Sequence, residues 1–234
     1  AIPPEGQART LNDHLGFAVH SEDGENWSAP IALEGTYGHY IWRAAAYGDR
    51  AYLCGRRRKG YADGQEERTD CTQIEGAMLE SEDGLVWRYR SLFTSEYGNE
   101  TAFLFEEDGQ CLALARGADA RPARICRSSP PYAHWEHSNL DRNVGGPLLV
   151  KWGEHYLVGG RKNIDPQEPR TTLYWLVGDQ LREIGQLPSG GDNSYPGFVA
   201  LDRTRALLSY YSSHEGSGSG LAPSGIYLSE LTLR

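Results

Sequence analysis

The side chains of this 234-residue chain that could do chemistry are mostly arginines and tyrosines at the ends of short apolar segments. Arg56, Arg116 and Arg161 each end such a segment, and a few acidic residues and tyrosines lie at comparable boundaries. A cluster of arginines can bind a small anion by charge-assisted hydrogen bonds, whatever the global charge. The formal net charge of −9 argues against nucleic acid or an anionic membrane surface as a partner. An anionic small molecule is therefore the expected ligand.

The elements that must position these residues are indicated by a repeat. Ser21–Trp27 returns at Ser81–Trp87 with two interior residues changed, and Ser128–Trp135 is a degenerate third copy. Each clear copy is an acidic residue followed by Gly, entered from an apolar stretch and left through a Trp, which predicts a turn between two strands. Acidic residues in such a motif invite a metal or catalytic interpretation, but their side chains also suit the turn itself. We expect the turn role.

Composition and spacing predict an all-β fold. The chain has 39% hydrophobic residues, 28 Gly and 12 Pro, a mixture that favours short strands and tight turns. Predicted second strands end at Arg56, Arg116, Arg161 and Tyr211, so the units repeat every 45 to 60 residues. Such steps are typical of the four-stranded antiparallel blades of a β-propeller. We predict 17 strands, in about four to five blades of one domain, residues 1–234.

The meander within each blade decides which side chains meet. The start of its first strand and the end of its second strand lie at the same end of the blade. One mouth should therefore collect arginines, one glutamate and several tyrosines from separate blades. The predicted rim is Trp42, Arg43, Arg56, Asn99, Glu100, Arg116, Asn143, Arg161, Asp192, Asn193, Tyr195, Tyr210, Tyr211 and His214.

These motifs together resemble the sialidase (neuraminidase) superfamily over nearly the whole chain. The repeated turn is similar to the Asp box, in a form one residue shorter between Asp and Trp. Asn99-Glu100-Thr101, Arg116 after its apolar strand, and Val158-Gly159-Gly160-Arg161 look like the family's Glu and its second and third Arg. Segments 191–197 and 208–216 resemble the last blade of uncharacterised bacterial sialidase-like proteins. The resemblance implies a six-bladed propeller.

The resemblance also implies roles. Arg116 and Arg161 would clamp a substrate carboxylate, and Tyr195 would be the nucleophile with Glu100 as its base. The expected function is exo-acting hydrolysis of an acidic sugar, without cofactor or metal. The family's first Arg and its Asp acid/base belong to early blades that have no counterpart here. Arg43 and Arg56 are candidates to replace that Arg, Asp192 and His214 are positional candidates for the acid, and Tyr211 joins the substrate-binding set.

Each rim residue also has a structural interpretation. An Arg at a strand end is often a salt-bridged surface residue, Glu100 could be a surface turn residue, and Tyr195 could be a packed aromatic at a strand start. His214 precedes a Gly/Ser-rich stretch typical of a mobile loop. The alternative function is accordingly a non-catalytic propeller that binds an anionic carbohydrate or a protein partner.

Four to five predicted blades are fewer than the six of the family, so the propeller would have an open edge. A fragment of a longer protein, a smaller closed propeller, or a second copy that covers the edge would each resolve it. No apolar run approaches the length of a membrane span, and residues 1–14 do not have the pattern of a signal peptide. The compartment is not visible in the sequence, and bacterial cytoplasm is slightly favoured over secretion. None of the four cysteines forms a CxxC pair. Cys111 and Cys126 could face each other on neighbouring strands, and two buried thiols are favoured over a disulfide.

Overall fold

The structure is a computed structural model that describes residues 14–59, 70–162, 168–215 and 223–233. Its described part contains 17 strands and one short 3-10 helix, η3 (Cys71–Gln73). The predicted lead-in before Leu15, most of the charged loop after Arg58 and the Gly/Ser-rich stretch after Glu215 lie outside these ranges. The strands form antiparallel sheets, which confirms the predicted all-β propeller.

Three sheets have four strands, one has three, and a two-stranded hairpin precedes them. The hairpin is β1 (Phe17–Ala18) and β2 (Ile31–Ala32). The first blade is β3 (Tyr40–Tyr47), β4 (Arg50–Arg58), β5 (Ile74–Ser81) and β6 (Arg88–Thr94). The second is β7 (Thr101–Phe105), β8 (Cys111–Ala115), β9 (Arg124–Ser128) and β10 (Glu136–Asn139). The third is β11 (Gly145–Trp152), β12 (His155–Lys162), β13 (Arg170–Val177) and β14 (Gln180–Gln186). The last is β15 (Asn193–Ala200), β16 (Arg205–Ser212) and β17 (Gly225–Thr232).

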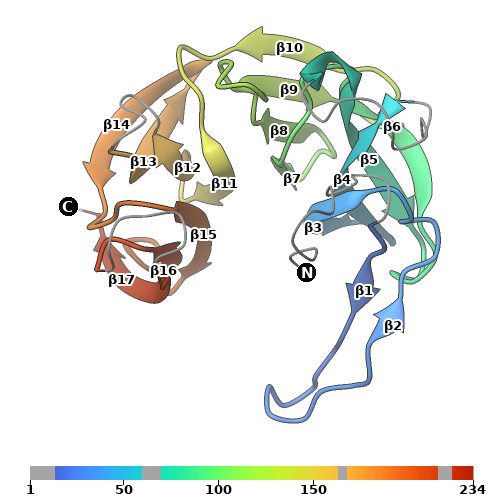
Figure 1. Ribbon diagram of the computed structural model, residues 1–234, viewed down its shortest axis with the longest axis horizontal. Helices are drawn as coiled ribbons and strands as arrows, with labels where there is room; N and C mark the ends of the chain where they lie inside the picture. The colour runs from blue at the N-terminus through green and yellow to red at the C-terminus, as the bar shows by residue number, and fades with distance from the viewer. Residues whose placement is uncertain (1–13, 60–69, 163–167, 216–222, 234) are drawn as a thin grey trace, which may run out of the picture.

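The four blades follow one another around an open arc, with the β1–β2 hairpin projecting beyond the first blade (Figure 1). Neighbouring first strands touch, β3 with β7, β7 with β11 and β11 with β15, so these strands line the centre. Side chains at the starts of all four first strands therefore come together.

The core consists of apolar layers between consecutive blades. Ile125 of the second blade packs in one buried cluster with Val158 and Tyr174 of the third. Cys54 and Phe103 belong to the layer between the first and second blades. The strands between two layers are buried on both faces, as the run Cys111–Ala115 shows. This packing fixes the angle between blades and hence the distances across the mouth.

The two clear repeats form the same hydrogen-bonded turn. Asp83 Oδ1 accepts from the backbone N–H groups of Leu85 and Val86, at 2.8 and 2.9 Å. Asp23 Oδ1 accepts the two equivalent bonds in the first copy. The degenerate copy at 128–135 also joins a third strand to a fourth, β9 to β10. The structure thus assigns both aspartates a turn contact, whereas their equivalence to sialidase Asp boxes stays a prediction.

Two first strands contain a proline close to the mouth, Pro147 in β11 and Pro196 in β15. β11 starts at Gly145 and β15 at Asn193, so each strand begins before its proline. Proline has no N–H to donate, so it usually marks a strand's limit. Here each strand carries a register shift beside its proline, between Gly145 and Leu148 and between Ser194 and Gly197. The shift accommodates the missing donor within the strand.

The four cysteines are free thiols. Cys111 and Cys126 are both buried, as favoured by the sequence, and burial raises the pKa of the Cys126 thiol to about 12. Within the described ranges, no helix is long and apolar enough to cross a membrane. The same ranges hold no group of three or more His, Cys, Asp or Glu side chains arranged to bind a metal ion.

Candidate functional site

The register of the inner strand pairs places the predicted rim residues opposite each other. Tyr40 pairs with Arg56 and Gly145 pairs with Arg161. The backbone N–H of Arg116 donates to the carbonyl of Glu100 at 3.0 Å. In the last blade Ser194 pairs with Tyr211. Three blades thus present an Arg at the same level of the mouth, and the last blade presents a Tyr.

A tyrosine, a glutamate and an arginine from three strand ends form a connected network. The hydroxyl of Tyr195 donates to Glu100 Oε1 at 2.7 Å. Arg116 Nη1 donates to Glu100 Oε2, also at 2.7 Å. Gly146 adds its backbone N–H to Oε2 at 3.2 Å. Residues nearly a hundred positions apart in the chain therefore share one carboxylate.

Glu100 is held as an anion although its side chain is buried. Burial by itself raises the pKa of a carboxyl group, since it disfavours the charged form. The charge and hydrogen bond of Arg116 and the bond from Tyr195 outweigh it, so the pKa of Glu100 lies below its ordinary value. Burial and the nearby Glu100 charge raise the pKa of Tyr195 well above its ordinary value. The resting pair is a neutral phenol beside a carboxylate.

Unusual backbone conformations aim Tyr195 at Glu100. Ser194 has φ 146° and Tyr195 has φ 54°, in a region that favours glycine. The buried Ser194 hydroxyl donates to the carbonyls of Gly145 and Gly146, at 2.6 and 3.2 Å. Gly146 has φ 56°, and a Cβ there would lie 2.2 Å from the Tyr195 ring. The irregular segments of β11 and β15 are thus locked together, and each requires the other's shape.

A second ion pair lies beside the first. Arg161 Nη1 is 3.2 Å from Asp192 Oδ1, and the hydroxyl of Tyr211 donates to the same oxygen at 2.8 Å. The Tyr195 and Tyr211 rings are 5.3 Å apart. A Cβ on Gly145 would lie 3.6 Å from both Arg116 Cζ and Arg161 Nε, so the two guanidinium groups flank one glycine.

The first blade closes the network from the other side of the mouth. Trp42 packs on Tyr195 with ring centroids 4.4 Å apart. Arg43 Nη2 donates to the carbonyl of Pro196 at 2.6 Å, while Arg56 Nη1 donates to Asn99 Oδ1 at 2.9 Å. Arg43 and Arg56 thus reach the mouth, bound to a backbone carbonyl and an amide rather than to a carboxylate.

Several buried donors around this network lack a hydrogen-bond partner. They are the Nε atoms of four arginines and the indole nitrogen of a tryptophan: Arg43, Arg56, Arg116, Arg161 and Trp42. A buried donor without a partner usually lowers the free energy of unfolding by about 1–3 kcal/mol, so such a donor is expected to have a structural or functional explanation. All five belong to the predicted rim.

His214 is the predicted site residue that the structure places apart from this network. Its Nδ1 lies 2.9 Å from Ser212 Oγ, and its ring packs 4.8 Å from that of Tyr227. It lines a pocket beside β13 and β14 instead. His214 follows the end of β16 and packs beside the β14–β15 connection, so its position next to the rim in sequence did not bring it into the network. Asn143 likewise turns outward and donates to the carbonyls of Gly117 and Arg121.

Sequence reasoning missed the two residues that shape the site, Ser194 and Gly146. Neither carries charge, and a serine beside a tyrosine is common. The available signal was the pairing of Gly-Gly-Pro at 145–147 with Ser-Tyr-Pro at 194–196, since proline after a glycine or a strained residue marks an irregular strand.

Comparison with known proteins identifies the fold. No family model matches the chain, and no curated protein matches it. A protein of unknown function from Dyadobacter fermentans is similar in structure, with a TM-score of 0.72, 20% identity, and 93% of this chain covering 64% of that one. A mutant of NanB sialidase from Streptococcus pneumoniae is similar with a TM-score of 0.62 and 15% identity, and the match covers 93% of this chain and 35% of NanB. A GH43 β-xylosidase/α-arabinofuranosidase from a compost metagenome is similar with a TM-score of 0.53 and 13% identity, and the match covers 83% of this chain and 71% of the enzyme.

These comparisons establish a β-propeller like those of sialidases and other glycoside hydrolases. The identities are low, so the likeness is one of fold. The chain spans less than two thirds of the Dyadobacter protein's length. A shared propeller hosts different activities, and the site must decide among them.

Proposed function

We propose that the chain is a sialidase-like glycoside hydrolase, or a degenerate relative of one, that acts on a terminal acidic sugar. The observation that carries this proposal is the Tyr195 hydroxyl held 2.7 Å from a buried, ionised Glu100. A phenol that attacks an anomeric carbon must lose its proton, and a base within hydrogen-bond reach can take it. Arg116 and Arg161, close to one glycine, would bind the sugar's carboxylate by forked hydrogen bonds.

The leaving alkoxide needs an acid, and the described rim supplies a poor one. Asp192 accepts from Tyr211 and pairs with Arg161, as an ionised carboxylate does. His214 lies outside the network. General acid catalysis is usually worth about 10²–10⁴ in rate. We therefore expect slow or no hydrolysis of an unactivated sialoside, and faster turnover of an aryl sialoside, whose leaving group needs little protonation.

The second candidate is a non-catalytic propeller that binds an anionic carbohydrate or a protein partner at the same mouth. The absence of an assigned acid among the described rim residues favours it. Both candidates predict binding of an acidic sugar or another small anion, and only the first predicts a covalent role for Tyr195.

The deciding assay compares an aryl sialoside with sialyllactose for the wild type and Tyr195→Phe. Phenylalanine keeps the ring contact with Trp42 but removes the nucleophile. We expect aryl sialoside turnover to be lost in the variant while affinity for free sialic acid changes little. Turnover that survives Tyr195→Phe would remove the nucleophile, and rapid sialyllactose hydrolysis would show that an acid is present. Binding without any turnover would favour the second candidate.

A further inference from the structure

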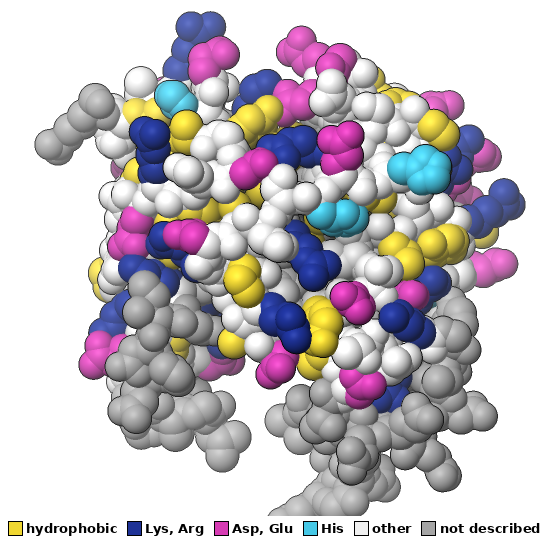
Figure 2. Space-filling view, turned by 90° about the horizontal axis from the view of Figure 1, so that it is seen from above, with side chains coloured by type: hydrophobic (Ala, Val, Ile, Leu, Met, Phe, Trp, Pro, Cys, Tyr) yellow, Lys and Arg dark blue, Asp and Glu magenta, His cyan; other side chains and the backbone are white. Residues whose placement is uncertain are grey.

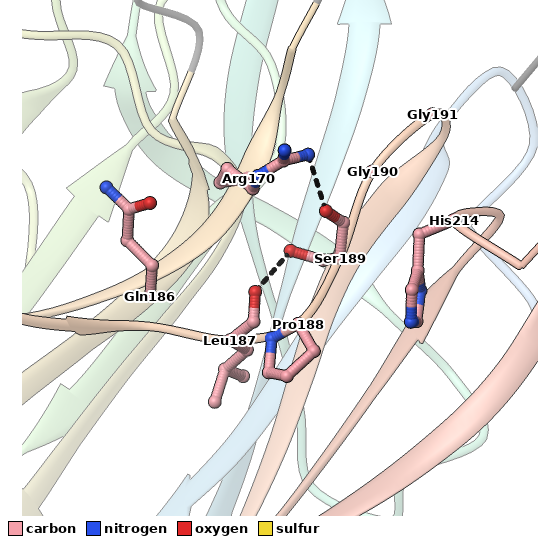
Figure 3. A pocket seen from close by; sticks show the side chains of 8 residues that line it. All are labelled: Arg170, Gln186, Leu187, Pro188, Ser189, Gly190, Gly191 and His214. Atoms are coloured by element: carbon pink, nitrogen blue, oxygen red, sulfur yellow. Dashed lines mark hydrogen bonds between the residues drawn. The ribbon is translucent and has the colours of Figure 1, made fainter.

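A pocket separate from the Tyr195–Glu100 network lies between the third and last blades. It has a volume of about 620 Å³ and is lined by Arg170, Gln186, Leu187, Pro188, Ser189, Gly190, Gly191 and His214 (Figure 3). The residues come from the start of β13, the end of β14, the β14–β15 connection and the end of β16. These are mouth-side ends of strands, so the pocket opens beside the candidate site. The size suits a small ligand.

Arg170 is fixed as a donor in this pocket. Its Nη1 donates to the carbonyl of Ser189 at 2.6 Å (Figure 3). Its Nη2 lies 3.5 Å from a carboxylate oxygen of Glu168. The side chain of Glu168 is 72% exposed, so this ion pair is a weak one. A guanidinium group has five N–H donors. Bound on one side by the carbonyl, it keeps further donors for a ligand.

Gly190 brings Arg170 and His214 to the same space. A Cβ at this position would lie 3.0 Å from Arg170 Nη1 and 3.3 Å from His214 Cβ. Any side chain there would push the two apart. The backbone of Gly190 is itself held, because its N–H donates to Ser212 Oγ at 3.0 Å. Arg170 Nη1 and the Cβ of His214 therefore both lie against one fixed backbone position.

The imidazole is also oriented. Ser212 Oγ lies 2.9 Å from His214 Nδ1, while Tyr227 packs on the ring. The Ser212 hydroxyl donates its proton to the carbonyl of Gly190 at 3.1 Å, so its oxygen acts as an acceptor toward Nδ1. The ring proton then sits on Nδ1, and Nε2 is a hydrogen-bond acceptor.

We propose that this pocket is a second subsite, which binds an acidic sugar next to the one at the Tyr195–Glu100 pair. Arg170 would bind the carboxylate or sulfate group by charge-assisted hydrogen bonds, and His214 Nε2 would accept a hydrogen bond from a hydroxyl group of the sugar. The apolar side chains of Leu187 and Pro188 and the Gln186 amide suit the ring and its hydroxyl groups. Gly191 joins the subsite to Asp192, which pairs with Arg161 in the first site. The inference rests on the proposed function only for the expectation of a sugar.

The test uses glucuronate, glucose and acetate as probes, with binding followed by NMR of the His214 imidazole. The signal is assigned through His214→Gln among the seven histidines. We expect glucuronate to shift this signal at concentrations where glucose and acetate do not. Arg170→Met should weaken glucuronate binding at least about tenfold, the loss expected for a charge-assisted hydrogen bond. Arg182→Met, an equal change of charge on exposed β14, is the matched control.

If glucose and glucuronate shifted the signal equally, the pocket would not select an acidic group and the proposal would be overturned. If acetate bound as tightly as glucuronate, the pocket would be a simple anion site and the proposed binding of a sugar would be overturned. Binding unaffected by Arg170→Met would also overturn it. If Arg170→Met lowers the melting temperature, Arg170→Lys is used in its place, because it keeps the positive charge but loses the forked hydrogen-bond geometry of the guanidinium group. Tyr195→Phe should leave glucuronate binding here unchanged. Loss of aryl sialoside turnover with this binding intact would separate failure of the proposed function from failure of the subsite.

Discussion

The proton between Tyr195 and Glu100 limits what the candidate site can do. The ordinary pKa values of Tyr and Glu differ by nearly six, so complete transfer to Glu would cost about 8 kcal/mol. The environment widens the difference, because it lowers the pKa of Glu100 and raises that of Tyr195. Tyr195 would therefore have to attack as its proton moves, rather than after forming a free phenolate.

Glu100 should make folding depend on pH in the acid range. Its folded pKa is below the ordinary value of 4.5, so its stabilising effect is complete above that value and is lost as pH falls through the folded pKa. Glu100→Gln should destabilise the protein by about 1–3 kcal/mol at pH 7, since Arg116 loses its charged partner. The difference from wild type should shrink below pH 4.5, measured by urea unfolding at several pH values. A difference constant down to pH 3 would contradict the ionised, paired Glu100.

At the scale of elements, the irregular strand β11 determines the site as much as the charged residues do. Gly146→Ala would place a methyl group against the Tyr195 ring, where 2.2 Å is far inside contact distance. Gly153, at the β11–β12 turn, also has positive φ, 60°, but nothing lies within 4 Å of its Cβ position. Substitution by alanine should therefore cost a similar backbone strain energy at both glycines, but only at Gly146 would the new Cβ clash with another side chain.

Gly153→Ala should therefore cost roughly 1–2 kcal/mol, the penalty for a left-handed alanine. Gly146→Ala should cost more and should also abolish Tyr195-dependent turnover or ligand binding. Thermal unfolding with a binding assay checks both variants. Equal stability of the two with full binding in Gly146→Ala would show that Tyr195 is not positioned by β11.

The repeated turns are a second feature at the scale of elements. Asp83→Ala removes the acceptor for the Leu85 and Val86 N–H groups, so it should lower the melting temperature by roughly 2–4 °C. Affinity at the mouth should not change, because these turns join strands at the opposite end of the blade. Glu25→Ala in the first turn is the control, because it keeps the backbone N–H that donates to Asp23. A loss of affinity at unchanged melting temperature would assign the turn a role in binding.

At the scale of the whole molecule, the two ends of the arc expose apolar side chains. On β17, Ile226 is 86% and Leu228 67% exposed, and among the described strands β17 pairs only with β16. On the hairpin at the other end, Phe17 is 58% and Trp27 62% exposed. Figure 2 shows basic and acidic side chains interspersed over one face of the molecule.

We propose that a second copy of the chain covers these ends, since an unpaired edge strand with apolar side chains invites pairing. Ile226→Lys should shift the protein toward monomer in sedimentation equilibrium. Ile184→Lys, on β14 of the third blade, makes the same substitution at a 45% exposed position and should not. A wild type that is monomeric at high concentration would contradict self-association.

The sequence alone determined the fold class and the blade step, and it indicated several residues at the mouth, although not the places of His214 and Asn143. Glycine and proline punctuation sets short strands, and a meander forces Glu100 opposite Arg116, so these follow from local chemistry and chain connectivity. The disposition of Cys111 and Cys126 as buried thiols also followed from local pattern.

Only the tertiary structure decided which mouth residues touch. The Tyr195–Glu100 bond joins residues from different blades, and it depends on the irregular backbone at Ser194 and Gly146, which a local pattern does not specify. The position of His214 in a separate pocket depends in the same way on how the last blade packs against the third. Contacts between blades are set by the packed layers among all the strands, and that packing cannot be read from any one segment.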